Sequence, residues 1–417
     1  MNTIPVQKKN TEVVYADIII KCLLLITWPV GAFLFALLRP GSRSSYLVYF
    51  IFGLLFAWNM EFQGGSYFDI LHIIERFESQ KHMTSAELGR LVESFFDGTA
   101  EEKDLYNIFI NWITQQFSSS YHTMYVIAGI PYLLLMLSSL HTITSSPKFK
   151  AGLSGLLVMF LFILPKDIFA LQNFRFATAT WMAIYSLIYY FRTREAKYAV
   201  LLLITPLVHS SFFFLDAVFL LYLILTKYKF THKLVIILYF CSIPFAFLDS
   251  SYLHLLDVSI LPVYLQDWAS GYLSDNAAEA FGTFNLSSSR LYLYCTVGKI
   301  IAFSVGGILL IKFLKRPEIC DNTRKLLLFY LLFAAITYFC QFIPVLGSRF
   351  WDISRIFFIY VWFVAIYPNK NWFLFIILCT CSFEIFYAGI DHYTRIIDPE
   401  FYISSLPALI EKYLYLQ

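Results

Sequence analysis

Long apolar runs separated by short polar connections limit what this chain can fold into. Several of these runs reach the roughly 20 residues that an α-helix needs to cross a membrane. We count twelve runs, at 18–38, 46–62, 121–141, 151–171, 177–191, 197–208, 212–226, 233–249, 291–314, 326–345, 356–367 and 372–389. Asp, Glu, Lys and Arg make up only 14% of the 417 residues, against about 25% in soluble domains. The sequence therefore predicts a single all-α membrane domain over residues 1–417, a polytopic transmembrane helical bundle of about twelve spans.

The positive charges predict which connections face the cytoplasm. Six short connections hold sixteen of the 31 Lys and Arg residues within 49 positions: 39–45, 142–150, 191–197, 226–233, 312–325 and 368–371. Lys and Arg are enriched in cytoplasmic loops of membrane proteins. The loops 63–120 and 250–290 and both termini are therefore predicted to face outward, although Lys8, Lys9 and Lys21 oppose this placement of the N-terminus.

The composition excludes several other classes of protein. A net charge of +3 without a basic face is not that of a nucleic-acid-binding protein. Six of the seven cysteines lie in or beside apolar runs, and Cys320 lies in a basic loop, so no extracellular disulfide framework is expected. No spacing typical of metal ligands lies near the polar segments described below, and neither a metal nor a cofactor is expected.

The run 198–225 has an intermediate length. Its 28 residues would make a helix of about 42 Å, too long for one upright span and too short for two full ones. Basic residues flank both ends, so both ends are predicted to be cytoplasmic. We therefore expect a hairpin of two short helices that turns at 205–211. Polar backbone at that depth must be buried or line a wet cavity, which places His209 at the floor of an outward-facing pocket. A single tilted helix is the alternative.

The first outer loop contains two sequence signatures of helix starts. Thr84-x-x-Glu87 and Thr99-x-x-Glu102 have the capping-box pattern, and apolar residues follow each at helical spacing. Two amphipathic helices are predicted, lying on the membrane surface or on the bundle. A role in guiding a lipid substrate and simple packing within a solvated loop both remain open.

Polar residues near the predicted outer ends of helices are the candidates for chemistry, because ionisable groups at membrane depth are costly. Asn173 and Arg175 lie between the fourth and fifth runs and follow Lys166 and Asp167. Arginine can donate two parallel hydrogen bonds to a phosphate. Alternatively, Arg175 reaches lipid headgroups or pairs with Asp167.

Other candidates come from separate segments. His209 can act as a general base near neutral pH or serve a structural role at the turn. Arg349 and Arg355 are six residues apart and so lie on different helical faces; they ligate different groups, or one of them pairs with Asp352. Asp69 can orient or deprotonate an attacking hydroxyl, or it is a turn residue.

The second outer loop and the deeper charges complete the set. Tyr264 and Trp268, with Arg290 at the end of the loop, suit the faces and hydroxyls of sugars, although interfacial aromatic belts use the same residue types. Three charged residues lie deeper in the apolar runs, where buried pairs are expected in preference to a proton relay: Asp216, Lys299 and Glu384.

Three stretches taken together resemble the EpsG/Wzy-type bacterial polysaccharide polymerases. They are Asn173-Phe174-Arg175-Phe176-Ala177-x-Ala179, Leu207-Val208-His209-Ser210-Ser211 and Gly347-Ser348-Arg349-Phe350. Their order along the chain is also similar to the family's, as is the long outer loop after the second span. Members often have Gly-x-Asp followed by a tyrosine in that loop; here Ser66 or Tyr67 stands in place of that Asp, so the resemblance assigns no role to Asp69.

The resemblance implies a GT-C-like helical bundle in the bacterial cytoplasmic membrane, with an outward-facing catalytic cavity. The donor would be a glycan on undecaprenyl diphosphate and the acceptor a lipid-linked repeat unit. A chain-length regulator and a flippase would be partners. We expect Arg175, with Arg349 or Arg355, to neutralise the leaving diphosphate, and His209 or Asp69 to take the acceptor proton. A transferase that adds one unit and a flippase are the alternatives.

Overall fold

The structure is a computed structural model that describes residues 5–62, 68–80, 83–99, 104–228, 230–248, 290–317, 319–343, 345–383, 385–386 and 396–414. Within these ranges every regular element is a helix, and one isolated β-bridge joins Met60 and Ile397. The predicted all-α class is confirmed.

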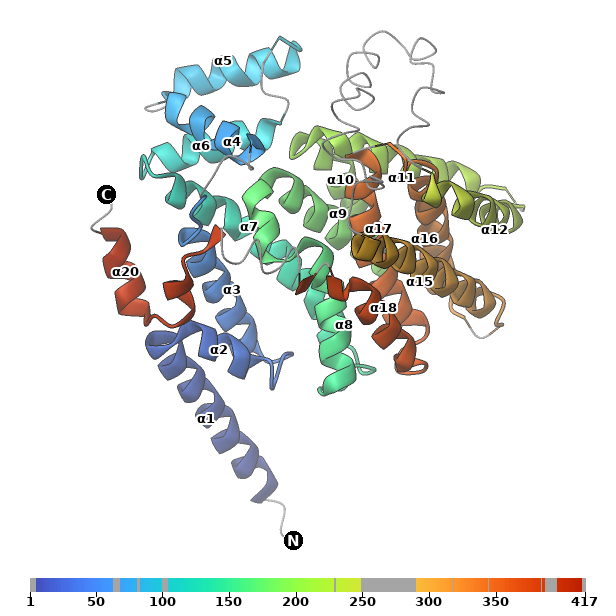
Figure 1. Ribbon diagram of the computed structural model, residues 1–417, viewed down its shortest axis with the longest axis horizontal. Coiled ribbons are helices and arrows are strands. Elements are labelled where there is room, and N and C mark those ends of the chain that lie inside the picture. The colour runs from blue at the N-terminus through green and yellow to red at the C-terminus, as the bar shows by residue number, and fades with distance from the viewer. Residues whose placement is uncertain are drawn as a thin grey trace.

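The α-helices differ widely in length (Figure 1). Their bounds are α1 Pro5–Thr27, α2 Pro29–Ala36, α3 Arg43–Trp58, α4 Phe68–Ser79, α5 Ser85–Phe96, α6 Leu105–Gln115, α7 Tyr121–Thr144, α8 Leu153–Ile163, α9 Phe174–Thr193, α10 Ala196–Leu203, α11 Phe213–Leu225, α12 Thr231–Ser242, α15 Arg290–Leu314, α16 Asp321–Phe339, α17 Leu346–Ala365, α18 Asn371–Phe383 and α20 Leu406–Leu414.

Three helical stretches of the described chain are long and apolar enough to cross a membrane: Tyr121–Thr144, Leu153–Thr193 and Tyr294–Leu314. Shorter apolar helical stretches cover Arg43–Trp58, Ala196–Leu207, Ser210–Leu225, Thr231–Phe247 and Asn371–Ser382. The predicted total of twelve spans is therefore not confirmed. Peripheral helices also expose apolar side chains, among them Leu23 on α1, Ile237 on α12 and Ile301 on α15, each at least half exposed. Such faces are suited to contact with lipid.

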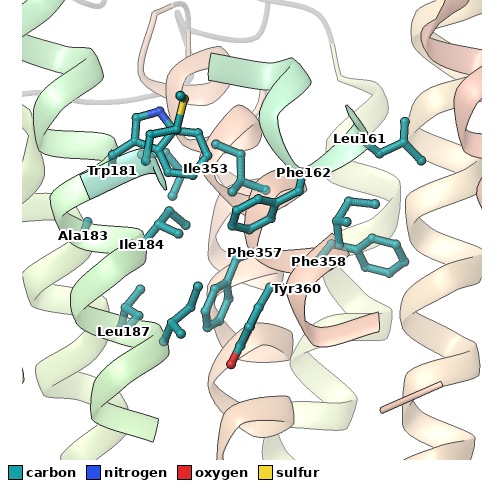
Figure 2. Packing of buried hydrophobic residues seen from close by; sticks show 14 of the residues in the cluster. Leu161, Phe162, Trp181, Ala183, Ile184, Leu187, Ile353, Phe357, Phe358 and Tyr360 are labelled. Atoms are coloured by element: carbon teal, nitrogen blue, oxygen red, sulfur yellow. The ribbon is translucent and has the colours of Figure 1, made fainter. Parts of the chain in front are cut away.

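The core lies where α8, α9 and α17 meet. Trp181 and Ile184 of α9 pack with Phe162 of α8 and with Ile353 and Phe357 of α17 (Figure 2), and all five side chains are fully buried. Most residues of α9 and α17 are buried, 14 of 20 in α9 and 16 of 20 in α17. Because side chains in such a core interdigitate with few voids, the first turns of α9 and α17 are held in fixed relative positions.

Two prolines interrupt runs that the sequence predicts to be continuous. The predicted span 18–38 is divided at Trp28, because α2 begins at Pro29, which has no N–H to continue α1. The predicted span 151–171 ends at Ile163, since Pro165 opens a 3₁₀ turn, Leu164–Lys166. A second 3₁₀ segment, Ile168–Asn173, leads into α9. Lys166 is thereby placed in a turn beside the start of α9.

The run 198–225 folds as two helices, α10 and α11. Between them lie two 3₁₀ turns, Thr205–Leu207 and Ser210–Phe212. His209 separates these turns with extended backbone angles of −153° and 118° and is 7% exposed. The predicted break is confirmed, and a single tilted helix is excluded.

Connections predicted to share the cytoplasmic side contact one another. Tyr46, just after the first of them, hydrogen-bonds Thr144 through the two hydroxyls at 2.6 Å. Lys148 donates at 2.7 Å to the backbone oxygen of Val364, in the last turn of α17 before the connection 368–371. Arg194 donates to Asn322 at 3.1 Å, which joins the connections 191–197 and 312–325.

The helices α4, α5 and α6 lie together at one end of the molecule (Figure 1). The predicted capping box at Thr84 is present: its hydroxyl accepts the Glu87 N–H, and the Glu87 carboxylate accepts the Thr84 N–H. The prediction that Thr99 starts the next helix is wrong, because α6 begins after Asp104 and the Thr99 hydroxyl donates to Ser94 O at the end of α5.

The two outer helices differ in burial. No residue of α5 is buried, and Phe96 at its end is 68% exposed. In α6 the buried stripe includes Asn107, Asn111 and Thr114 as well as isoleucines. It therefore differs from the purely apolar face that the spacing predicts, and α6 presents polar side chains to its neighbours.

Candidate functional site

Three segments far apart in the sequence converge on the ring of Phe176, which is 4% exposed. The guanidinium carbon of Arg349, in the first turn of α17, lies 5.2 Å from the ring centroid. The His209 ring lies 5.3 Å away, edge-on at 84°. Arg175 precedes Phe176 in the first turn of α9. The structure thus brings together three of the four predicted catalytic residues: Arg175, His209 and Arg349.

Lys166 is a further cation at this ring, to which the sequence analysis assigns no role. Its Nζ lies 5.4 Å from the Phe176 centroid. The 3₁₀ turn that carries it is anchored through its backbone oxygen, which accepts hydrogen bonds from Tyr132 Oη and Trp181 Nε1, both at 3.1 Å. Pro165, which ends α8, is the sequence signal for this turn.

Asp104 is the carboxylate of the site, and the sequence analysis missed it. One oxygen, Oδ2, accepts from Arg175 Nη1 at 3.0 Å, and the other, Oδ1, accepts from the Ser210 N–H at 2.9 Å. Its side chain is 4% exposed. Burial raises the pKa of Asp104 above its usual value, while the charges of Arg175 and Arg349 and the bond from Ser210 oppose the rise. We refer to the residues around this ring as the Phe176 cluster: Asp104, Lys166, Arg175, Phe176, His209 and Arg349.

Asp104 also occupies the N-cap position of α6 but makes no capping hydrogen bond there. An N-cap carboxylate ordinarily accepts a backbone N–H of its own helix. Here both oxygens turn instead toward Arg175 and Ser210. The outer-loop helix is therefore tied to α9 and to the turn before α11.

Aromatic packing holds that turn against α17. Phe212, which is fully buried, lies 5.4 Å from Phe176 and 5.7 Å from Phe350 between ring centroids. Phe214 also lies 4.5 Å from Phe350. Offset and edge contacts of this kind stabilise aromatic pairs. They fix His209 relative to Arg349, the neighbour of Phe350.

Arg355 packs against a different ring, with its guanidinium carbon 5.8 Å from the centroid of Phe303. Its side chain is 2% exposed; Nη1 donates to Asp352 at 3.2 Å and Nη2 donates to Cys381 Sγ at 3.3 Å. Asp352 also accepts from Lys166 Nζ at 2.7 Å. The sequence alternative in which one arginine pairs with Asp352 is therefore confirmed for Arg355, and Asp352 links Arg355 to Lys166.

The hydrogen bonds of His209 select its tautomer. The Ser211 N–H donates to Nδ1 at 3.3 Å, and the Ser211 hydroxyl lies 3.1 Å from the same atom. Because an amide N–H can only donate, Nδ1 carries the lone pair. A neutral His209 therefore has its proton on Nε2.

Asp167 and Asn173 flank the cluster. Asp167 Oδ1 accepts the Phe169 N–H at 3.0 Å and caps the 3₁₀ segment. Arg175 forms an ion pair with Asp104, a partner that the sequence analysis does not propose for it. Asn173 is the N-cap residue of α9, and its Oδ1 is buried without a hydrogen-bond partner among the described residues.

Several predicted residues lie outside what the structure describes. Asp69 is the second residue of α4 and Arg290 the first of α15, but neither side chain is among the described ones. Tyr264, Trp268 and Glu384 also lie outside the described residues. Asp216 on α11 is 6% exposed, and its Oδ1 has no hydrogen-bond partner in the described part of the chain.

Among the described residues, no group of three or more His, Cys, Asp or Glu is arranged to hold a metal ion. The Phe176 cluster combines three cations, Lys166, Arg175 and Arg349, with the carboxylate of Asp104; together with Asp352 and Arg355, which adjoin Lys166, four cations face two carboxylates. Such an excess of positive charge suits a phosphate-bearing ligand.

Comparisons with protein-family models, with curated proteins and with solved structures found no match for this chain.

Proposed function

We propose that this protein is a bacterial polysaccharide polymerase of the cytoplasmic membrane. It transfers a growing glycan from undecaprenyl diphosphate onto a lipid-linked repeat unit at the outer face. The observation that carries the proposal is that His209 and Arg349 lie beside one buried ring, that of Phe176, which follows Arg175 in the first turn of α9. These residues lie in the three stretches that resemble EpsG/Wzy-type polymerases.

The proposed architecture is a GT-C-like bundle of about twelve spans, with the shorter apolar helices completing the membrane-embedded part. The Phe176 cluster lies on the outer side, because Asp104 belongs to the loop 63–120. The helix α5 lies on the membrane surface, which accounts for an apolar face that the protein leaves partly exposed.

The proposed reaction forms one glycosidic bond and breaks one sugar–phosphate bond. An acceptor hydroxyl attacks the anomeric carbon of the donor, the bond to the diphosphate oxygen breaks, and undecaprenyl diphosphate leaves. Arg175 and Arg349, with Lys166 beside them, neutralise the charge that develops on the leaving group. Because these charged side chains are already positioned, they stabilise the leaving diphosphate without having to move during the reaction.

The acceptor proton needs a base. His209 Nδ1 already accepts from Ser211, so we assign His209 Nε2–H as a donor to the substrate. Asp69 remains the proposed proton acceptor, since α4 belongs to the same outer loop as Asp104. Asn173 is proposed to bind a sugar hydroxyl through its buried Oδ1, and Tyr264, Trp268 and Arg290 to bind more distant parts of the glycan.

The proposal is tested with purified protein in detergent and a fluorescent lipid-linked repeat unit, read on a gel. A ladder of products is expected. One added unit would support a single-addition transferase, and an unchanged substrate would support a flippase, which makes no new glycosidic bond.

A further inference from the structure

Asp104 occupies a place that is built for an anion. Its two oxygens meet a guanidinium N–H of Arg175 at 3.0 Å and a backbone N–H of Ser210 at 2.9 Å. Arg349 also acts electrostatically on this carboxylate. Two oxygens of a phosphate group can accept the same two donors in the same way.

Holding the charged Asp104 side chain in this position costs free energy. The carboxylate forgoes the cap of α6 and is almost fully buried. Its raised pKa reports the desolvation that the charged form bears in this position. A ligand with more negative charge would gain more from the same donors, and an expelled Asp104 would regain hydration.

We propose that Arg175 and the Ser210 amide form a phosphate subsite, and that Asp104 is a tethered competitor that a phosphate group of the lipid diphosphate displaces. The inference rests on the proposed function for the source of the phosphate. Binding at the subsite would then release Asp104, and with it the start of α6, from α9.

The competitor model and a fixed structural bridge predict opposite effects of Asp104→Asn. A tethered competitor lowers apparent affinity by the fraction of time for which the site is blocked. We expect D104N to bind inorganic pyrophosphate and farnesyl diphosphate about tenfold more tightly than the wild type. The double variant D104N/R175Q should lose this gain.

Asp352→Asn is the control for overall charge: it removes one carboxylate from the same basic region and leaves Asp104 in the subsite. Because this change is expected to destabilise the protein, binding is compared at a temperature at which both variants are folded. A similar gain in D352N would mean that overall charge sets the affinity and would overturn the proposal. Unchanged or weaker binding in D104N would also overturn it. A gain for pyrophosphate without one for farnesyl diphosphate would exclude the lipid as the source.

The Ser210 amide is tested separately, with Ser210→Pro and Ser210→Ala in the D104N background. Proline fits the first position of a short helix, and the extended angles of His209 are those required before proline. S210P removes the N–H, whereas S210A removes only the hydroxyl. We expect S210P, but not S210A, to weaken pyrophosphate binding in the D104N background. Equal affinities of the S210P and S210A variants would contradict a role for the amide.

Thermal unfolding checks whether D104N folds. If loss of the carboxylate destabilises the protein, pyrophosphate should raise the Tm of D104N more than that of the wild type, because it replaces the missing anion. An equal rise would contradict the proposal. If D104N gains no affinity for pyrophosphate while product formation still requires Arg175, the competitor role of Asp104 is refuted and the proposed polymerase function is not. If D104N binds pyrophosphate more tightly but the protein forms no glycosidic bond, the phosphate subsite is supported and the polymerase assignment fails.

Discussion

The carboxylate of Asp104 accepts a hydrogen bond from Arg175 Nη1 at 3.0 Å, although 71 positions separate the two residues. The contact joins the first outer loop to the first turn of α9. The loop 63–120 is therefore part of the candidate site, where it contributes the single carboxylate among the described residues of the Phe176 cluster.

Phe176 is expected to organise the cations of the site. Replacing it with Leu should reduce polymerisation about 10²-fold, because Lys166, Arg349 and His209 lose their common surface and displacements of about 1 Å have effects of this size. The matched control is Phe191→Leu on the same helix, where Arg194 lies 5.0 Å from the ring. Both variants should lose on the order of 1 kcal/mol of stability. Equal rates for the two would show that Phe176 serves packing alone.

Asp352 is expected to stabilise the fold through its two cations. Asp352→Asn leaves Lys166 and the buried Arg355 without their carboxylate, which should cost on the order of 2–3 kcal/mol. Thermal unfolding in detergent measures the effect. Glu195→Gln, which breaks an exposed pair with Lys197, should leave Tm unchanged. Similar Tm values for both variants would contradict a structural role for Asp352.

The C-terminal segment should detach in acid. The hydrogen bond from Lys412 and the Glu400 N–H hold the pKa of Asp398 below its usual value. The stabilisation is therefore complete above the usual Asp range and is lost as pH falls through the lowered pKa. Asp398→Asn should have the same effect at neutral pH, on the order of 1 kcal/mol. Faster hydrogen exchange in 396–414 measures it. Glu400→Gln is the control, and equal exchange in the two variants would refute the role of Asp398.

Cys320 provides a test of sidedness. It is exposed in a predicted cytoplasmic loop, and hydrogen bonds from Thr323 lower the pKa of its thiol, which favours the reactive thiolate. A membrane-impermeant maleimide should label it in inside-out vesicles but not in right-side-out vesicles. A cysteine introduced in the outer loop by Thr99→Cys, in the C320S background, should be labelled in right-side-out vesicles but not in inside-out vesicles. The same label from both orientations would contradict the assigned topology.

The sequence was sufficient to predict the helical class and the break between α10 and α11, and it singles out Arg175, His209 and Arg349, which the structure brings together. Each prediction rests on local information: an apolar run, a run too short for two spans, or a charge beside an apolar segment. The turns at Trp28 and Lys166 were not anticipated, although Pro29 and Pro165 are the local signals for them.

The long-range contacts of the candidate site cannot be predicted from local patterns in the sequence. The capping pattern at Thr99 predicts a start of α6 that is five residues too early, which places Asp104 inside the helix instead of at its N-cap. Its partners Arg175 and Ser210 lie 71 and 106 positions away, and local patterns do not determine such pairings. Spacing predicted that Arg349 and Arg355 face differently, but only packing against Phe303 and Cys381 shows that Arg355 is buried.

Product length made by purified Arg175→Ala tests the central claim most directly. Arg194→Ala, at the other end of α9, is the control, because Arg194 lies in the predicted cytoplasmic connection. With a fluorescent lipid-linked repeat unit, R194A should give the wild-type ladder. R175A should lose about 10²–10³ in rate and leave single units unextended. A full-length ladder from R175A at an equal protein level would contradict the account.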